Sequence, residues 1–135
     1  MEITTQSLAV GLDTVWVLLC AALVFFMEPG FAAFEAGLIH SRNSLNIMMK
    51  VLMDCTVGLI GFFLFGFALM YGADKFGMIG TSGFFLQGDF SHLGLKIPIY
   101  AFWLFQAAFA IAMATIISGA VAERMKFSPY LVFSL

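Results

Sequence analysis

Two glutamates stand inside an apolar stretch near the start of the sequence, and they are the first candidates for chemistry. Glu28 and Glu35 are the only charged residues in positions 14–39. An ionisable side chain inside a membrane-spanning segment is costly, usually faces a cavity or the bundle interior, and often marks a function. Because seven residues separate them, both side chains lie on the same side of an ideal helix, about 20° apart. This pattern is typical of an acidic lining that attracts or senses a cation.

Each glutamate also has a structural interpretation, which the sequence leaves open. Glu28 precedes Pro29 and Gly30, where a helix is expected to kink because proline lacks a backbone donor. Glu28 would accept hydrogen bonds from backbone donors freed in a broken neighbouring helix. Glu35, nearer the end of the stretch, would cap a loop.

A second apolar stretch, residues 98–124, has two sides of different composition. Residues spaced by three and four share one side of a helix. The aromatic side carries Phe102, Phe105, Phe109, Ala112 and Ile116, and the opposite side carries Ala107, Ala110, Ala114, Ser118 and Ala122. Small residues let helices approach closely in lipid, so we expect the small side to be packed. The aromatic side either meets something other than a close-packed helix or, as most aromatic stripes do, faces lipid or core.

Composition defines the class of protein. Hydrophobic residues make up 62% of the chain and charged residues only 10%, whereas about 25% is usual in soluble domains. The net charge of −2 and the lack of a basic run argue against nucleic-acid binding. Cys20 and Cys55 sit in apolar segments without CxxC spacing, so no cofactor, metal or redox site is expected. The sequence therefore predicts an all-α membrane protein, a polytopic helix bundle.

The apolar runs predict three full transmembrane helices and the start of a fourth within one domain, residues 1–135. The predicted spans are about 14–39, 50–71 and 98–122, with the fourth starting about 129. Asp13 and Thr14 are the expected N-cap of the first span. Lys50 and Asp54, four residues apart, are expected to pair near the membrane edge. The connection 72–96 is long and glycine-rich, and it is expected to fold over the mouth of the protein.

Basic residues predict the orientation. The first link, which follows the first predicted span, contains Arg42 and ends beside Lys50, and the third link, which follows the third span, contains Arg124 and Lys126. The second loop, residues 72–96, has Lys75 and Lys96, but Asp74 and Asp89 offset their charge. The positive-inside rule then places the first and third links in the cytoplasm and the N-terminus outside.

Two signatures suggest a family. They read DTVWVLLCAALVFFMEPGFAAFEAGLI at positions 13–39 and FQAAFA…SGAVAERMKF at positions 105–127, with FFLQG at 84–88 between them. In this combination, order and separation the chain resembles the ammonium transporter family (Amt/Mep, with the related Rh proteins). The resemblance covers nearly all of the chain, and it implies that the chain corresponds to about the first third of such a protein.

The resemblance implies an eleven-helix bundle that assembles as a homotrimer in the cell membrane, with a hydrophobic pore in each protomer. The ligand would be ammonium or ammonia, and a cytoplasmic regulatory protein is a further candidate partner. By motif position, Phe109 resembles the first gate phenylalanine and Phe105 its vestibule neighbour, which together bind the substrate. Ile116, Phe31 and Phe34 resemble pore-lining positions. Aromatic faces attract ammonium-type cations by about 0.5 to 2 kcal/mol, and a narrow apolar pore favours proton loss before passage.

The chain also departs from the family pattern. The family often has a neutral residue at the position of Glu28. The paired histidines of the pore would lie beyond Leu135, and neither His40 nor His92, both in connections, takes their place. Three hypotheses follow: an ammonium transporter, an ammonium-sensing membrane domain coupled to a signalling module, and a non-conducting membrane scaffold. An enzyme is not expected, because no nucleophile, base or metal cluster has useful spacing.

Overall fold

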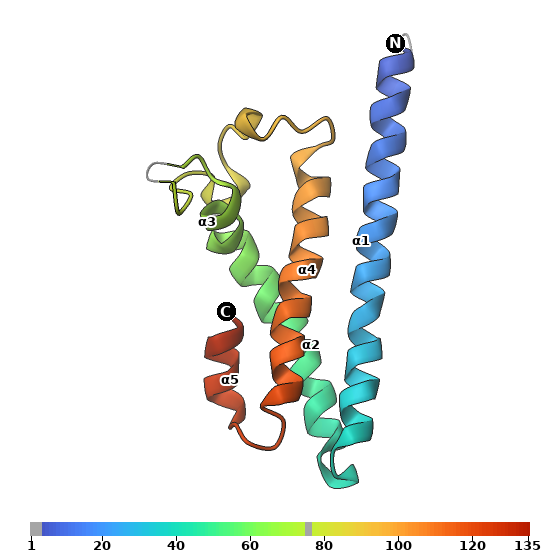
Figure 1. Ribbon diagram of the computed structural model, residues 1–135, viewed down its shortest axis with the longest axis vertical. Coiled ribbons are helices and arrows are strands. Elements are labelled where there is room, and N and C mark those ends of the chain that lie inside the picture. Colours follow the sequence, from blue (N-terminus) through green and yellow to red (C-terminus); the bar gives the residue numbers. More distant parts are fainter. Residues whose placement is uncertain (1–3, 75–76) are drawn as a thin grey trace.

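Helices make up most of the chain in the computed structural model, which describes residues 4–74 and 77–135 (Figure 1). The α-helices of these ranges are α1 (Thr5–Leu38), α2 (Ser44–Gly61), α3 (Phe67–Tyr71), α4 (Ile99–Ala120) and α5 (Phe127–Ser134). Short 3-10 turns lie at Ser41–Asn43, Phe84–Leu86 and Ser91–Leu93. A π-helical turn, Phe62–Gly66, joins α2 to α3, so that Ser41–Tyr71 is one helical stretch of 31 residues.

Three of the described helices are long and apolar enough to cross a membrane: Thr5–Leu38, Ser41–Tyr71 and Ile99–Ala120. With 34 residues, α1 is about 51 Å long, which exceeds a hydrocarbon core of about 30 Å. Helices suit this environment because they satisfy their backbone hydrogen bonds internally. The predicted fold class, an all-α membrane bundle with three long apolar helices, is confirmed.

The start of α1 was predicted wrongly. The helix begins at Thr5, and its N-cap is Thr4, whose side chain accepts a hydrogen bond of 3.3 Å from the backbone N–H of Ser7. Asp13 and Thr14 lie inside the helix, and the Thr14 hydroxyl donates to the carbonyl of Val10 one turn back. A side-chain hydroxyl can cap a helix or bond back within it, so residue type alone does not locate the cap.

The proline of α1 does not interrupt the helix. Pro29 lies inside α1, which continues through Gly30 to Leu38, and Figure 1 shows one long rod without the expected kink. Proline removes one hydrogen-bond donor, but α1 packs along α4 on both sides of this position. The expected kink at Pro29 was therefore wrong, and α1 runs straight along its contact with α4.

α4 is the central helix of the fold. It packs against both α1 and α2, which also contact each other, and α2 crosses behind it in Figure 1. Of its small side, Ala107 and Ser118 are buried and Ala110 and Ala114 are half-buried, so the packing expected of that side is largely found. The aromatic side is mixed: Phe109 and Ile116 are exposed, Phe105 is half-buried, and Ala112 is buried.

Phe102 belongs to an aromatic cluster at the end of the bundle near residues 72–98, which we call the loop end. Phe67 is fully buried there, with ring centroids 5.0 Å from Tyr71, 5.5 Å from Phe90 and 6.2 Å from Phe102. His92 is hydrogen-bonded to the Tyr71 carbonyl at 3.0 Å. The second loop thus packs onto the ends of α3 and α4. Lys75, used above to predict orientation, lies outside the described residues.

The opposite end of the bundle, with links 39–43 and 121–126, is the link end. Glu123 has a φ of +62°, which is unusual for a residue with a side chain. Its Oε1 accepts hydrogen bonds from Asn43 Nδ2 at 2.8 Å and from the His40 N–H at 3.4 Å. The bond from Asn43 lowers the pKa of the Glu123 carboxyl, with a smaller contribution from His40. These bonds tie the two links together.

A polar group anchors α5 to α2. Tyr130 is fully buried, and its hydroxyl donates to Asp54 Oδ2, while Ser134 Oγ donates to Asp54 Oδ1 at 2.8 Å. Lys50 Nζ lies 4.7 Å from the centre of the Tyr130 ring. The expected Lys50–Asp54 ion pair was wrong, because the hydroxyls of α5 occupy the carboxylate and the lysine faces the ring.

Replacing Gly80 should destabilise the loop end. A Cβ at Gly80 would lie 2.2 Å from the Ala68 carbonyl oxygen and 2.8 Å from Gly72 Cα, and both atoms belong to the backbone. We expect Gly80→Ala to lower stability by about 2 kcal/mol or more, measured as thermal unfolding of the complete protein in detergent. Gly11→Ala is the control, since nothing lies within 4 Å of its Cβ and alanine favours a helix interior. Equal unfolding temperatures for the two variants would contradict this account.

Candidate functional site

The two glutamates of α1 face α4, and each meets a hydroxyl. Glu28 Oε2 accepts a hydrogen bond of 2.7 Å from Thr115 Oγ1, and Glu35 Oε2 accepts one of 3.2 Å from Ser118 Oγ. Both acids are buried, with 3% and 5% of their surfaces exposed. The prediction that they share one side of the helix is therefore correct. Both structural interpretations were wrong, because the donors are side-chain hydroxyls of an intact helix and neither acid caps a loop.

The remaining oxygens of the two acids differ in their surroundings. Glu28 Oε1 is fully enclosed and has no hydrogen-bond partner among the described residues. Glu35 Oε1 lies beside Gly119, where an added Cβ would be only 3.2 Å away. In the described part of the chain Glu35 Oε1 accepts no hydrogen bond, and it is not among the enclosed atoms that lack a partner. Glu28 is thus sealed in the interface between α1 and α4, and Glu35 is not.

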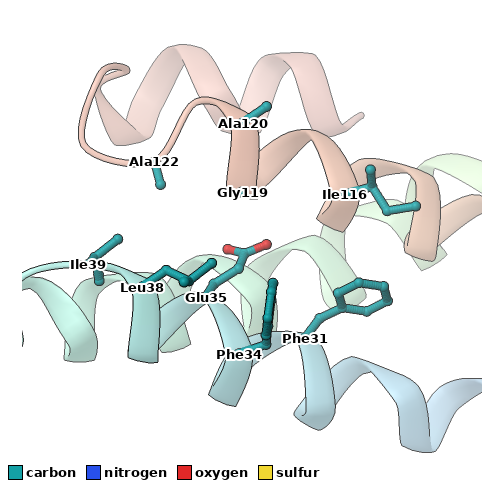
Figure 2. Close-up of a pocket in the computed structure, with 9 residues that line it drawn as sticks. All are labelled: Phe31, Phe34, Glu35, Leu38, Ile39, Ile116, Gly119, Ala120 and Ala122. Atoms are coloured by element: carbon teal, nitrogen blue, oxygen red, sulfur yellow. The ribbon is translucent and has the colours of Figure 1, made fainter.

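A groove of about 300 Å³ opens between α1 and α4 at the link end (Figure 2). Its lining is Phe31, Phe34, Glu35, Leu38, Ile39, Ile116, Gly119, Ala120 and Ala122. In Figure 2 the aromatic rings rise from α1, Ile116 lies on α4 across from Phe31, and the Glu35 carboxyl points between the two helices. The groove is almost wholly apolar, and Glu35 supplies its one charged side chain. The structure therefore brings Phe31, Phe34 and Ile116, three residues singled out from the sequence, into one groove together with Glu35.

Phe105 and Phe109 lie further along α4 toward the loop end. Their ring centroids are 5.0 Å apart, with an angle of 77° between the ring planes, an edge-to-face arrangement favoured between aromatic rings. Phe109 is 45% exposed, and it stands two turns, about 10 Å, before Ile116. The two rings do not line the groove themselves. They lie on the same side of α4 as Ile116, which lines the groove. The three side chains therefore form a row along α4 that ends at the groove.

Sequence reasoning missed the partners of the acids. Thr115 and Ser118 are fully buried, and Ser118 was expected only to provide a small surface. Gly119 leaves the space that the Glu35 carboxyl fills. Two hydroxyls three residues apart in an apolar helix were the available signal, because polar groups at that depth need partners. Within residues 4–74 and 77–135, no group of three or more His, Cys, Asp or Glu residues has a geometry that would hold a metal ion.

Together, the long apolar helices, the buried acids and the aromatic-lined groove define a multi-pass membrane protein. The chain belongs to the Ammonium Transporter Family, whose model matches residues 15–135. This confirms the family suggested by the two signatures.

The relatives show how much of such a protein the chain represents. It is 50% identical over 122 residues to Ammonium transporter Amt2 of Archaeoglobus fulgidus, covering 90% of this chain and 25% of that protein. It is 39% identical to Ammonium transporter Amt1 of Haloferax mediterranei, covering 99% of this chain and 25% of that protein. The structure also resembles a solved Sensor Amt Protein, with a TM-score of 0.83 at 34% identity, covering 93% of this chain and 30% of that one. The chain thus spans about a quarter of the length of these curated relatives.

Removing the Thr115 hydroxyl should destabilise the contact between α1 and α4. Thr115→Val keeps the shape but leaves the buried Glu28 carboxyl without its donor, which costs about 1–3 kcal/mol. Thr115→Ser keeps the hydroxyl and should lose less. Thermal unfolding of the complete protein in detergent measures both.

Thr56→Val is the second control, because Thr56 is exposed and its hydroxyl bonds only to Leu52 of its own helix. We expect it to leave the unfolding temperature nearly unchanged. A Thr115→Val protein as stable as Thr56→Val would show that the buried hydrogen bond contributes little.

Proposed function

We propose that the complete protein carries ammonium or ammonia across the cell membrane through a hydrophobic passage to which this chain contributes one wall. The observation that carries the proposal is the line of side chains on α4: Phe105 and Phe109, then Ile116, which lines the groove together with Phe31 and Phe34. Membership of the ammonium transporter family supports the substrate. The curated relatives are named as ammonium transporters.

Phe105 and Phe109 are proposed to recognise and gate the substrate at the outer vestibule. An aromatic face attracts an ammonium-type cation, and the attraction grows when water is excluded. The Phe109 ring is partly exposed in this chain and so is accessible to a ligand. The edge of one ring against the face of the other fixes their orientation.

The groove is proposed to form the inner part of the passage. Apart from Glu35 its lining is apolar, so a charged ion passing along it would lose most of its hydration with little compensation. The free energy of desolvation is much smaller for the neutral form, ammonia. An apolar wall beyond an aromatic recognition site therefore favours loss of a proton before passage.

The remaining features of the proposal concern assembly and orientation. The N-terminus lies outside, and the link end, with its basic residues Arg42, Arg124 and Lys126, lies in the cytoplasm. Each passage belongs to one protomer of a homotrimer, and the link end is where a cytoplasmic regulatory protein would bind. The exposed apolar faces of the spans, α1 above all, are consistent with burial against lipid and further helices.

A sensing role is the second candidate, because the solved structure that this chain resembles is named Sensor Amt Protein. In that case the complete protein would bind ammonium without flux and carry a signalling module. A membrane scaffold that binds no ligand is the third. Measuring both ammonium binding and flux in liposomes separates the three.

Shortening either ring should weaken transport. Phe109→Ala and Phe105→Ala each remove an aromatic contact of about 0.5 to 2 kcal/mol, so we expect the uptake of labelled methylammonium to fall by about 2- to 30-fold. Phe26→Ala is the control, because Phe26 is an exposed ring on α1 that makes no ring contact with another described residue. Uptake by both α4 variants at the level of the control would contradict the roles given to these rings.

A further inference from the structure

The unpartnered oxygen of Glu35 is the feature that the proposed function does not explain. Glu35 is 95% buried by its neighbours, yet only one of its oxygens accepts a hydrogen bond, and the side chain lines an otherwise apolar groove. We propose that the Glu35 carboxyl is a proton-exchange site for ammonia in the inner part of the passage. This inference rests on the proposed function and adds to it the residue that returns the proton.

The position of the carboxyl is built by its surroundings. Ser118 holds Oε2, and Gly119 leaves the space in which Oε1 sits. Any side chain at position 119 would press on Oε1, since even a Cβ would approach to 3.2 Å. The helix α4 thus both orients the acid and makes room for it.

The groove is large enough for the exchange. Its volume is about 300 Å³, roughly ten times the volume of about 30 Å³ that one water molecule occupies in liquid water. Ammonia is similar in size to water. Phe31, Phe34 and Ile116 border the space in front of the carboxyl (Figure 2). A small neutral base moving along this wall therefore meets one acid, and it meets it close to the link end.

Glu28 shows why the inference concerns Glu35 alone. Both acids are buried on the same side of α1 and both accept a hydrogen bond from α4. The free oxygen of Glu28 is fully enclosed, and Glu28 is not among the residues that line the groove. Glu28 therefore belongs to the packing between the helices, and it provides a matched control.

The exchange is a balanced acid–base step. The protonated carboxyl of Glu35 gives its proton to the lone pair of ammonia, so that the O–H bond breaks, an N–H bond forms, and ammonium and a carboxylate result. The ammonium ion leaves toward the link end, where water can hydrate it. Water on that side then gives the next proton to the carboxylate and leaves as hydroxide, so each cycle converts ammonia and water into ammonium and hydroxide. No electron is transferred, and the carboxyl is regenerated in each cycle.

The titratable and charged groups that influence Glu35 lie on three helices. They are Glu28 on α1, Lys50 and Asp54 on α2, and Tyr130 on α5. The last three form the polar anchor of α5 described above, and Glu28 is bonded to Thr115. None of these four side chains lines the groove in the described part of the chain. Glu35 is thus the acid there that ammonia would reach.

The test measures uptake of labelled methylammonium into liposomes that contain the complete protein, at several internal pH values. Glu35→Gln keeps the size of the side chain and an oxygen for Ser118 but cannot release a proton. We expect it to lower the initial rate by about tenfold or more and to abolish the dependence of the rate on internal pH. Glu28→Gln should retain the rate and the internal-pH dependence of the unchanged protein.

The outcomes separate this inference from the proposed function. If the unchanged protein gives no uptake above empty liposomes, the proposed function is wrong, and the inference falls with it. If the unchanged protein conducts and Glu35→Gln keeps both its rate and its internal-pH dependence, the inference alone is wrong. Should Glu35→Gln fail to fold, Glu35→Asp decides. The aspartate side chain is one methylene shorter, so its carboxyl lies further from the groove. We expect the Glu35→Asp protein to take up methylammonium more slowly and to keep the dependence of the rate on internal pH. An unchanged rate overturns the inference.

Discussion

The contact between α1 and α4 is the constraint on which the rest of the structure depends. Two acids of α1 reach across to two hydroxyls of α4, at a depth where an unpaired polar group is costly. Neither helix can rotate or slide without breaking these bonds. Along this contact α1 stays continuous through Pro29, and Phe109 and Ile116 of α4 are exposed beside it. The groove lies beside the Glu35–Ser118 bond, with Phe31 of α1 and Ile116 of α4 in its lining.

The other contacts fix this pair within the bundle. At the loop end, Phe67 packs against rings from both α4 and the second loop. Near the link end, Tyr130 and Ser134 of α5 are bonded to Asp54 of α2. α4 is therefore held against both α1 and α2, and its exposed aromatic side is the part left for a ligand or for further helices.

Much of this could be predicted from the sequence, and the failures have physical causes. The apolar runs predicted the three long helices, and the seven-residue spacing predicted that Glu28 and Glu35 share a side. The start of α1 was missed, because Thr4 and Thr14 are equally suited to capping by residue type. The partners of the acids and of Asp54 were missed as well, because Thr115, Ser118 and Tyr130 come from helices more than 70 residues away along the chain. Only the packing of those helices brings them together.

Access to the groove during transport tests the central claim most directly. In the complete protein, with Cys20 and Cys55 replaced by serine, Ala122→Cys would place a thiol in the groove, because its side chain points toward α1 (Figure 2), and Leu19→Cys would place one on an exposed face of α1. The account predicts that a small thiol reagent stops methylammonium uptake by the Ala122→Cys protein and leaves uptake by the Leu19→Cys protein unchanged. Uptake by Ala122→Cys that persists after its thiol is fully modified would show that the substrate does not pass through this groove.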